Sequence, residues 1–304
     1  MVDSIGPRIR RRGRVLLAAG TAALALPATA LAAVPAASWY WALAAPTAST
    51  KVLLLGTSTG VYRSSDGGKT WHASGLAGVD TTSLVRSGSS VYAGGVRAPA
   101  TTKGIVTVGG VYVVAPGAGV LAVSADGGST WRTLHPKGLP ELAVQALAVD
   151  PAHASVLYAV LRNGALYRST DGARSFALVT RRVGGTPWAL AVTAGGRLVA
   201  GDMTTGAFLE RSPTQWEHTP FSDPRGSQMV MEYAVQPGSP SHLVMSSYGV
   251  VRSTNGGESW SVALRSKVMF GPVAYASSKV AYAVGWDRSV WRSGDGGATW
   301  TRVP

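Results

Sequence analysis

The sequence predicts an all-β fold, a β-propeller of six blades that each contain four antiparallel strands. Three observations support this prediction: a short segment recurs five times, strand-like patterns repeat every ~40–45 residues, and glycine and proline are abundant. The 304 residues include 38 glycines and 17 prolines, which indicates many tight turns. Units of this length bury their apolar faces only when they stack on neighbours, as propeller blades do. A ring of seven blades is the alternative.

The recurring segment spans Ser64–Trp71 (SSDGGKTW), and similar segments occupy residues 124–131, 169–176, 253–260 and 293–300. An Asp or Asn side chain in such a turn accepts hydrogen bonds from nearby backbone N–H groups. Glycine takes the positive-φ positions, and tryptophan begins the next strand and buries a large ring. We therefore interpret the repeated side chains as structural, not as catalytic acids or metal ligands: Ser64, Asp66, Gly68, Trp71, Ser124, Asp126, Gly128, Trp131, Ser169, Asp171, Ser253, Asn255, Gly257, Trp260, Ser293, Asp295, Gly297 and Trp300.

The pattern S-x-D-x-G-x-[ST]-W resembles the Asp-box, or BNR, repeat of a superfamily of β-propellers. The resemblance implies the fold more strongly than any activity. The superfamily contains sialidases and xyloglucan-type glycosidases. It also contains non-catalytic members, namely sortilin-type receptors and photosystem II assembly factors.

The spacing of the boxes predicts one degenerate copy and one insertion. The box Asp or Asn positions are 66, 126, 171, 255 and 295, so one gap of 84 residues spans two repeats. A copy without Asp and Gly fills it at Leu209–Trp216. The gap of 60 residues holds one repeat plus an insertion, residues 97–117, between the second and third strands of blade 2. Its two apolar runs, 104–108 and 111–115, favour a hairpin.

Residues 1–32 predict a signal peptide. Five arginines between positions 8 and 14 precede an apolar run, residues 15–26, and Ala30-Leu31-Ala32 then provides a small-x-small cleavage site. An uncleaved membrane anchor is the alternative, and it is the only route by which we expect the chain to reach a membrane. Residues 33–304 then form a single propeller domain with the inserted loop 97–117. We expect an exported protein, located outside the cell, in the periplasm or at the envelope surface.

The composition narrows the classes of partner and cofactor. The net charge is +13, and it becomes +9 when the five arginines and one aspartate of residues 1–32 are removed. A basic surface suits an anionic polymer, a glycan or a protein. Nucleic acid is not expected, because the protein is exported and its basic residues are dispersed. The chain has no cysteine and five scattered histidines, so we predict no metal site and no cofactor. We expect a monomer.

In a meander blade, the box turns share one face of the ring, here called the box face, with the turns between first and second strands. The opposite loop face carries the loops between second and third strands and the connections between blades. Binding sites form where loops converge. Arginine suits bidentate contacts with carboxylate or phosphate. The candidate ligand-binding residues on the loop face are Arg97, Lys103, Lys137, Arg162, Arg181, Arg182, Arg225, Arg265, Lys267 and Arg288.

Glu232 is a candidate for a different reason. The inner strands share a pattern at residues 41–44, 145–148, 188–191 and 231–234. Strand alternation predicts that Leu43 and its equivalents face the blade core and that Ala42, Ala146 and Ala189 face the central channel. Glu232 aligns with these alanines, so its carboxylate is expected in the channel. There it is either a ligand contact or a solvated side chain.

The function predicted from these features is that of an exported, non-catalytic propeller that docks a protein or binds an anionic ligand. Photosystem II assembly factors resemble the chain in repeat length, signal peptide and arginine content, which suggests an assembly factor. A sialidase-like or other glycoside hydrolase is the alternative. However, the arginine-bearing F/Y-R-I-P motif of sialidases is missing ahead of the first blade, and no motif suggests the pair of carboxylates that glycosidases use. Catalytic residues are therefore unassigned.

Overall fold

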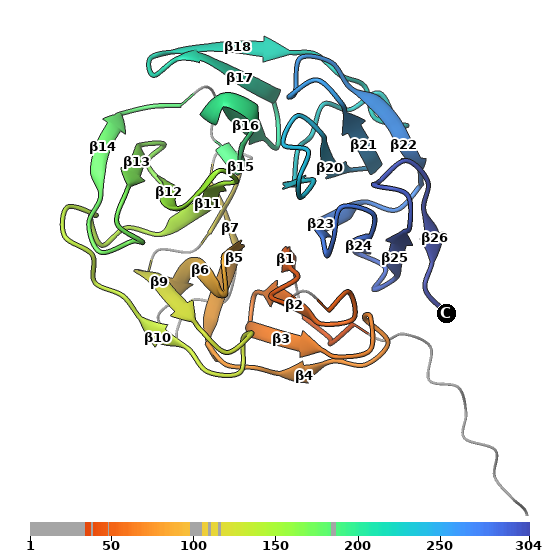
Figure 1. The fold of residues 1–304 in the computed structure, drawn as a ribbon, viewed down its shortest axis with the longest axis horizontal. Helices are drawn as coiled ribbons and strands as arrows, with labels where there is room; N and C mark the ends of the chain where they lie inside the picture. The colour runs from red at the N-terminus through yellow and green to blue at the C-terminus, as the bar shows by residue number, and fades with distance from the viewer. Residues whose placement is uncertain are drawn as a thin grey trace, which may run out of the picture. The chain divides into compact units, whose positions relative to one another are not determined.

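The computed structural model describes residues 34–37, 39–47, 49–97, 117–183 and 187–304, together with the backbone of 105–108 and 111–114. The predicted signal peptide and Lys103 lie outside the described residues. Six four-stranded antiparallel sheets surround a central axis, which confirms the six-bladed propeller (Figure 1). Among the described residues, no helix is long and apolar enough to cross a membrane.

Each blade is a meander with its first strand at the axis and its fourth at the rim of the ring (Figure 1). Blade 1 contains β1 (Tyr40–Ala44), β2 (Leu53–Thr57), β3 (Gly60–Ser64) and β4 (His72–Ala73). Blade 2 contains β5 (Val79–Ser87), β6 (Ser90–Arg97), β9 (Ala118–Ser124) and β10 (Arg132–Thr133). Blade 3 contains β11 (Val144–Asp150), β12 (His153–Leu161), β13 (Leu166–Ser169) and β14 (Ala177–Thr180).

The second half of the chain repeats this arrangement. Blade 4 contains β15 (Pro187–Val192), β16 (Leu198–Asp202), β17 (Gly206–Ser212) and β18 (Gln215–Thr219). Blade 5 contains β19 (Glu232–Val235), β20 (Leu243–Ser247), β21 (Gly249–Ser253) and β22 (Ser261–Arg265). Blade 6 contains β23 (Phe270–Tyr275), β24 (Ala281–Gly285), β25 (Val290–Ser293) and β26 (Thr301–Arg302).

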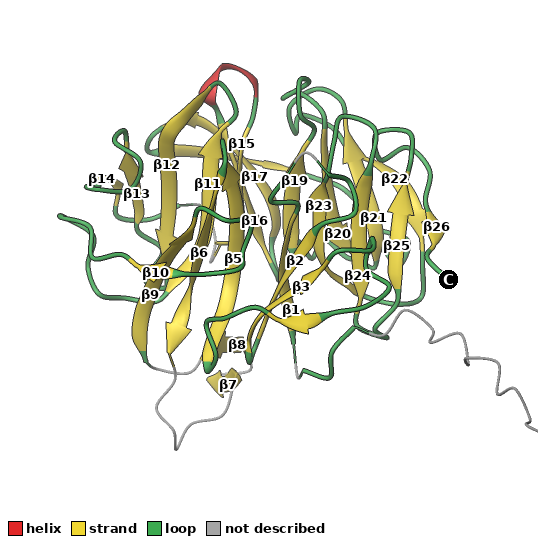
Figure 2. Cartoon of the chain, turned by 60° about the horizontal axis from the view of Figure 1, so that its bottom comes forward, coloured by secondary structure: helices red, strands yellow, loops and turns green. Residues whose placement is uncertain are grey.

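The predicted hairpin of the insertion is present as β7 (Ile105–Val108) and β8 (Val111–Val114). These two antiparallel strands form a separate sheet and lie between β6 and β9 in the sequence. The short 3₁₀ helix η1 (Ala194–Gly196) lies in the turn between β15 and β16 and therefore marks the box face. Figure 2 shows η1 and the hairpin at opposite ends of the ring, so the hairpin lies on the loop face.

Side-chain alternation on the inner strands differs from the prediction. Leu43 packs with blade 6, in a cluster with Ala274 and Val284, whereas Ala42 packs with blade 2, against Val79. The two faces of a strand therefore contact the two neighbouring blades, because the blades stand radially and each sheet is covered on both sides. The prediction that Ala42 faces the channel is wrong, because Ala42 is buried against blade 2. Ala146 and Ala189 border the central cavity as predicted, but Leu43, Leu147 and Leu190 border it too, so the alternation does not separate channel from core.

The ring closes through side-chain contacts between blades 1 and 6. Blades 1 and 6 are each continuous in sequence, and among the described strands none is exchanged between them. Tyr40, Leu53 and Leu55 of blade 1 share a buried cluster with Tyr282 and Val290 of blade 6. The Tyr282 hydroxyl also donates a hydrogen bond to the Thr50 carbonyl at 2.9 Å. Burial of apolar surface between the two ends of the chain therefore holds the ring shut.

The box turns have the structural role that was predicted. In the first, Ser64 Oγ accepts a hydrogen bond from Gly68 N at 2.9 Å and donates one to Asp66 Oδ1 at 2.8 Å. Asp66 Oδ1 accepts from Thr70 N at 2.9 Å, and Oδ2 accepts from Thr70 Oγ1 at 2.6 Å. The same bonds recur in the boxes at Asp126, Asp171 and Asp295. The Asn255 box keeps the bonds to the backbone, but there the side-chain amide donates to Ser259 Oγ. The bonds to the aspartates stabilise the ionised form, led by the threonine hydroxyl, and lower the pKa of Asp126 and of Asp295 to about 2.

Blade 4 has no box, and an ion-pair network takes the place of one. β17 and β18 are joined by a turn of Pro213 and Thr214 alone. Arg211 beside this turn contacts Glu258 in the box of blade 5 with two N–O distances of 2.8 Å, and Glu217 at 2.6 Å. The bidentate contact links blades 4 and 5 on the box face.

We expect Asp66→Ala to lower the free energy of unfolding by about 1–2 kcal/mol, because the backbone N–H groups of Lys69 and Thr70 lose their acceptor. Asp66→Asn is the matched control. Asn255 holds the equivalent position in blade 5 and accepts from Ser259 N at 3.0 Å, so the amide is expected to retain most of the stability. Chemical denaturation measures both. Equal losses for the two variants would show that the turn does not depend on this acceptor.

Candidate functional site

The basic residues predicted for the loop face lie in loops of that face, except Lys137, whose backbone pairs with Arg174 and Phe176 at the end of the blade 3 box. Arg97 ends β6, Arg265 ends β22, and the others occupy loops after second strands or connections between blades. Arg162 is half-buried, and the rest are exposed. The topology therefore brings to one face eight described members of the set: Arg97, Arg162, Arg181, Arg182, Arg225, Arg265, Lys267 and Arg288.

Three of these arginines are held in place by neighbouring groups. Arg97 Nη1 donates to the Ala77 carbonyl at 3.1 Å. The Arg225 guanidinium lies over the Tyr248 ring, 4.4 Å from its centroid, and Nη2 donates to the Lys267 carbonyl at 2.6 Å. Arg288 Nε donates to the Val34 carbonyl at 2.8 Å. Each guanidinium has five N–H donors, so most of its donors still point toward solvent. These side chains are oriented before a ligand arrives, which reduces the entropy lost on binding.

A cavity of about 490 Å³ occupies the central channel. Its lining includes Gly88, Pro151 and Gly238 of the turns between first and second strands, so the cavity opens on the box face. Toward the loop face, the lining ends at Trp41 and Trp188. We predicted a site on the loop face near the channel. This cavity opens on the opposite face, so it is not that site.

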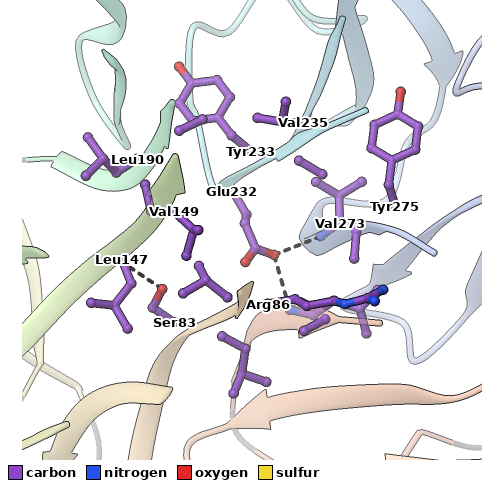
Figure 3. A pocket seen from close by; sticks show the side chains of 18 of the residues that line it. Ser83, Arg86, Leu147, Val149, Leu190, Glu232, Tyr233, Val235, Val273 and Tyr275 are labelled. Carbon is purple, nitrogen blue, oxygen red and sulfur yellow. Dashed lines mark hydrogen bonds between the residues drawn. The ribbon is translucent and has the colours of Figure 1, made fainter. Parts of the chain in front are cut away.

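Glu232 points into this cavity, as its position in the sequence predicted, although for a different reason. It lies on the face of β19 directed toward blade 6, and its side chain is long enough to reach the axis. Glu232 Oε2 accepts hydrogen bonds from Val273 N at 2.9 Å and Leu43 N at 3.3 Å (Figure 3). Burial raises the pKa of Glu232 well above its ordinary value, and the two backbone bonds only partly oppose this. The carboxyl group thus ties blade 5 to blades 6 and 1.

Tryptophans close the channel toward the loop face. The rings of Trp41 and Trp188 stack with centroids 5.4 Å apart, and Trp39 stacks on Trp41 at 5.6 Å. Trp286 meets Trp39 edge to face at 4.8 Å. These rings pack with apolar side chains of blades 1, 2 and 5 and form the floor of the cavity.

Asp80 lies behind this floor and is buried. Its Oδ1 accepts a hydrogen bond from Trp41 Nε1 at 2.5 Å, and its Oδ2 has no partner among the described residues. Burial raises the pKa of Asp80 to about 6, although the Trp41 bond opposes the shift. The tryptophans at the floor of the cavity therefore contact a second carboxyl group, that of Asp80, through Trp41 Nε1.

Four acids outside the cavity are held by local contacts. Asp202, Asp223 and Asp287 accept hydrogen bonds from backbone N–H groups of their own loops, and Glu217 pairs with Arg211. Among the described residues that line the cavity, Glu232 is the only acid. Within the same part of the chain, no three His, Cys, Asp or Glu side chains gather to hold a metal ion.

Sequence reasoning missed the tryptophan floor and Asp80. A signal for the floor was present, because Trp41 and Trp188 occupy the same position in two of the aligned inner strands. Asp80 gave no signal, since its importance arises from contact with Trp41 on another blade.

The fold and the box turns place the chain in the class of Asp-box propellers, and the profile of the BNR/Asp-box repeat matches residues 62–73. More specifically, the profile described as photosynthesis system II assembly factor YCF48 matches residues 104–304, about two thirds of the chain. The chain belongs to this family. No match was found among curated proteins.

Solved structures share the fold at low sequence identity. A YCF48 described as bound to D1 peptide has a TM-score of 0.51 and 18% identity, over 89% of this chain and 82% of that one. A Bacteroides thetaiotaomicron protein of unknown function has a TM-score of 0.61 and 11% identity, over 84% and 69% of the two chains. An ancestral GH74 enzyme has a TM-score of 0.52 and 14% identity, over 86% and 40%. These likenesses show the propeller fold alone.

The wild type is expected to lose folding stability as the pH rises to neutral because Asp80 ionises, and Asp80→Asn is expected to abolish this loss. The pKa of Asp80 is about 6 in the folded chain and near its ordinary value of 3.8 when unfolded. The folded state therefore holds the proton more tightly, so stability falls as pH rises from about 4 to 6 and stays lower above that. We expect the wild type to lose about 2–3 kcal/mol more than the variant between pH 4 and pH 8. Parallel denaturation curves at both pH values measure this, and identical pH dependence would contradict it.

Proposed function

We propose that this protein is an assembly-factor-like propeller that binds a segment of a partner protein through its loop face. Membership of the YCF48 family supports this proposal, and a YCF48 of the same fold is described as bound to D1 peptide. The observation that carries it is the concentration of exposed, positioned arginines on one face, in the absence of a carboxylate pair among the described residues of the cavity.

The charge of this face defines the chemistry of the partner. Guanidinium groups form bidentate hydrogen bonds with carboxylates, so an acidic segment or a free C-terminal carboxylate is the expected ligand. Long-range attraction between a basic face and an acidic segment also speeds association. Arg225 and Arg288 belong to blades next to one another, which suits an extended segment lying across the loop face.

The test uses the full-length chain and a synthetic acidic peptide with a free C-terminus, with the same sequence in amide form as a comparison. The variant Arg181→Gln/Arg182→Gln/Arg288→Gln is expected to lose affinity at least ~10-fold, because each lost contact to a carboxylate weakens binding. A matched variant with the same loss of charge, Arg132→Gln/Arg292→Gln/Arg302→Gln, alters exposed residues outside the loop face and is expected to bind normally.

Titration calorimetry at two salt concentrations measures this difference, and binding by the wild type should weaken as salt rises. Equal losses in the two triple variants would show that net charge alone attracts the peptide. Binding that survives in both would overturn docking through the loop face.

We also propose that the protein is exported by a cleaved signal peptide at residues 1–32. The basic segment, the apolar run and the small-x-small site support this proposal. Expression of the full-length chain followed by cell fractionation and intact mass measurement is expected to yield an exported form that begins at Ala33. A full-length form in the membrane fraction would instead indicate the anchor.

A further inference from the structure

The cavity on the box face is separate from the proposed docking face and has features of its own. Its walls come from inner strands of several blades and combine apolar with polar surface; Leu147, Leu190 and Val273 supply part of the apolar side (Figure 3). Beyond Glu232 the lining continues along the chain through Gln236 and Pro237 to Gly238 in the turn at the opening, so the carboxyl group lies several residues below the rim.

One oxygen of the Glu232 carboxyl group is available to a ligand. Oε2 is occupied by the N–H groups of Val273 and Leu43, whereas Oε1 has no hydrogen-bond partner among the described residues and faces the cavity (Figure 3). A buried ionised carboxylate is costly unless a cation or donors stabilise it. The two backbone bonds supply part of that stabilisation and leave one strong acceptor directed at the ligand space.

The floor of the same cavity lies beside a second carboxyl group. Trp41 and Trp188 are the deepest aromatic residues in the lining; their rings stack on one another, and Trp39 also stacks on Trp41. The Trp41 N–H donates to Asp80, which increases the electron density of the indole ring. Two carboxyl groups and two tryptophans therefore surround the inner end of the channel, in a chain whose net charge is +13.

We propose that this cavity binds a primary alkylammonium group, with the ammonium at Glu232 Oε1 and the aliphatic stem along the apolar side of the wall toward the box face. The group belongs either to a free aliphatic amine or to a lysine side chain of a partner. The depth of the carboxyl group below the rim suits a stem of several methylene groups.

Binding is expected to release a proton. Burial raises the pKa of Glu232 well above its ordinary value, and a bound ammonium group would lower it again by favouring the carboxylate. Among the residues lining the cavity, the other titratable groups are Arg86, Tyr233 and Tyr275. The two tyrosine hydroxyls donate to the carbonyls of Ala200 and Gly296, and Arg86 at the rim donates to the carbonyls of Gly88 and Thr47. Affinity for the amine should therefore rise with pH.

The experiment titrates the full-length chain with n-pentylamine and with 1-pentanol, which has a similar stem and no charge. Tryptophan fluorescence and calorimetry in two buffers of different protonation enthalpy follow binding and proton release. We expect pentylamine to bind at least tenfold more tightly than pentanol and the affinity to increase between pH 6 and pH 8. A capped pentapeptide with one central lysine, compared with its norleucine analogue, distinguishes a partner's lysine from a free amine.

Glu232→Gln is the decisive variant. The amide oxygen still accepts the two backbone N–H bonds, so the fold is expected to persist, whereas the negative charge is lost and pentylamine affinity should fall at least tenfold. Arg86→Gln removes a positive charge from the rim and should increase the affinity. Unchanged pentylamine binding in a folded Glu232→Gln chain, or absence of binding by both pentylamine and the lysine peptide, would overturn the proposal. Neither result bears on peptide docking at the opposite face.

Discussion

Packing between neighbouring blades is the constraint on which the whole structure depends. Each sheet has two apolar faces, and only the blades on either side cover them. Because burial of apolar surface is the main stabilising contribution, no blade is stable alone and the chain must close into a ring. The clusters that join the first and last blades show that this closure uses the same packing as every other junction.

Ring formation also leaves backbone N–H groups of the inner strands without a neighbouring strand, and Glu232 accepts hydrogen bonds from two of them. The inner strands turn one edge toward the axis, where their backbone groups have no neighbouring strand to pair with. Glu232 Oε2 accepts from the N–H groups of Leu43 and Val273, and Ser83 Oγ accepts from Leu147 N at 2.9 Å. Side chains of other blades thus accept hydrogen bonds from the N–H groups at the unpaired strand edges. An unpaired buried N–H group would be costly. A carboxyl group in the central channel is one result of this requirement.

The two faces of the ring have different chemical character. The loop face carries exposed arginines on loops, where substitutions alter charge without disturbing the blades. The box face carries the tight turns and the opening of a cavity with a single acid among its described residues. The tryptophan layer separates the cavity from the loop face. A ligand of one face therefore need not compete with a ligand of the other.

The sequence by itself determined the features that depend on local interactions. The box turns, the number of blades, the inserted hairpin and the face that carries Arg181 and Arg288 all follow from spacing, turn chemistry and strand order. Only the tertiary structure decided what lines the axis. Leu43 and Glu232 are 189 positions apart, and Trp41 and Asp80 are 39 apart, yet each pair is joined by a hydrogen bond. Such contacts arise when the ring closes, so no local pattern of residues specifies them.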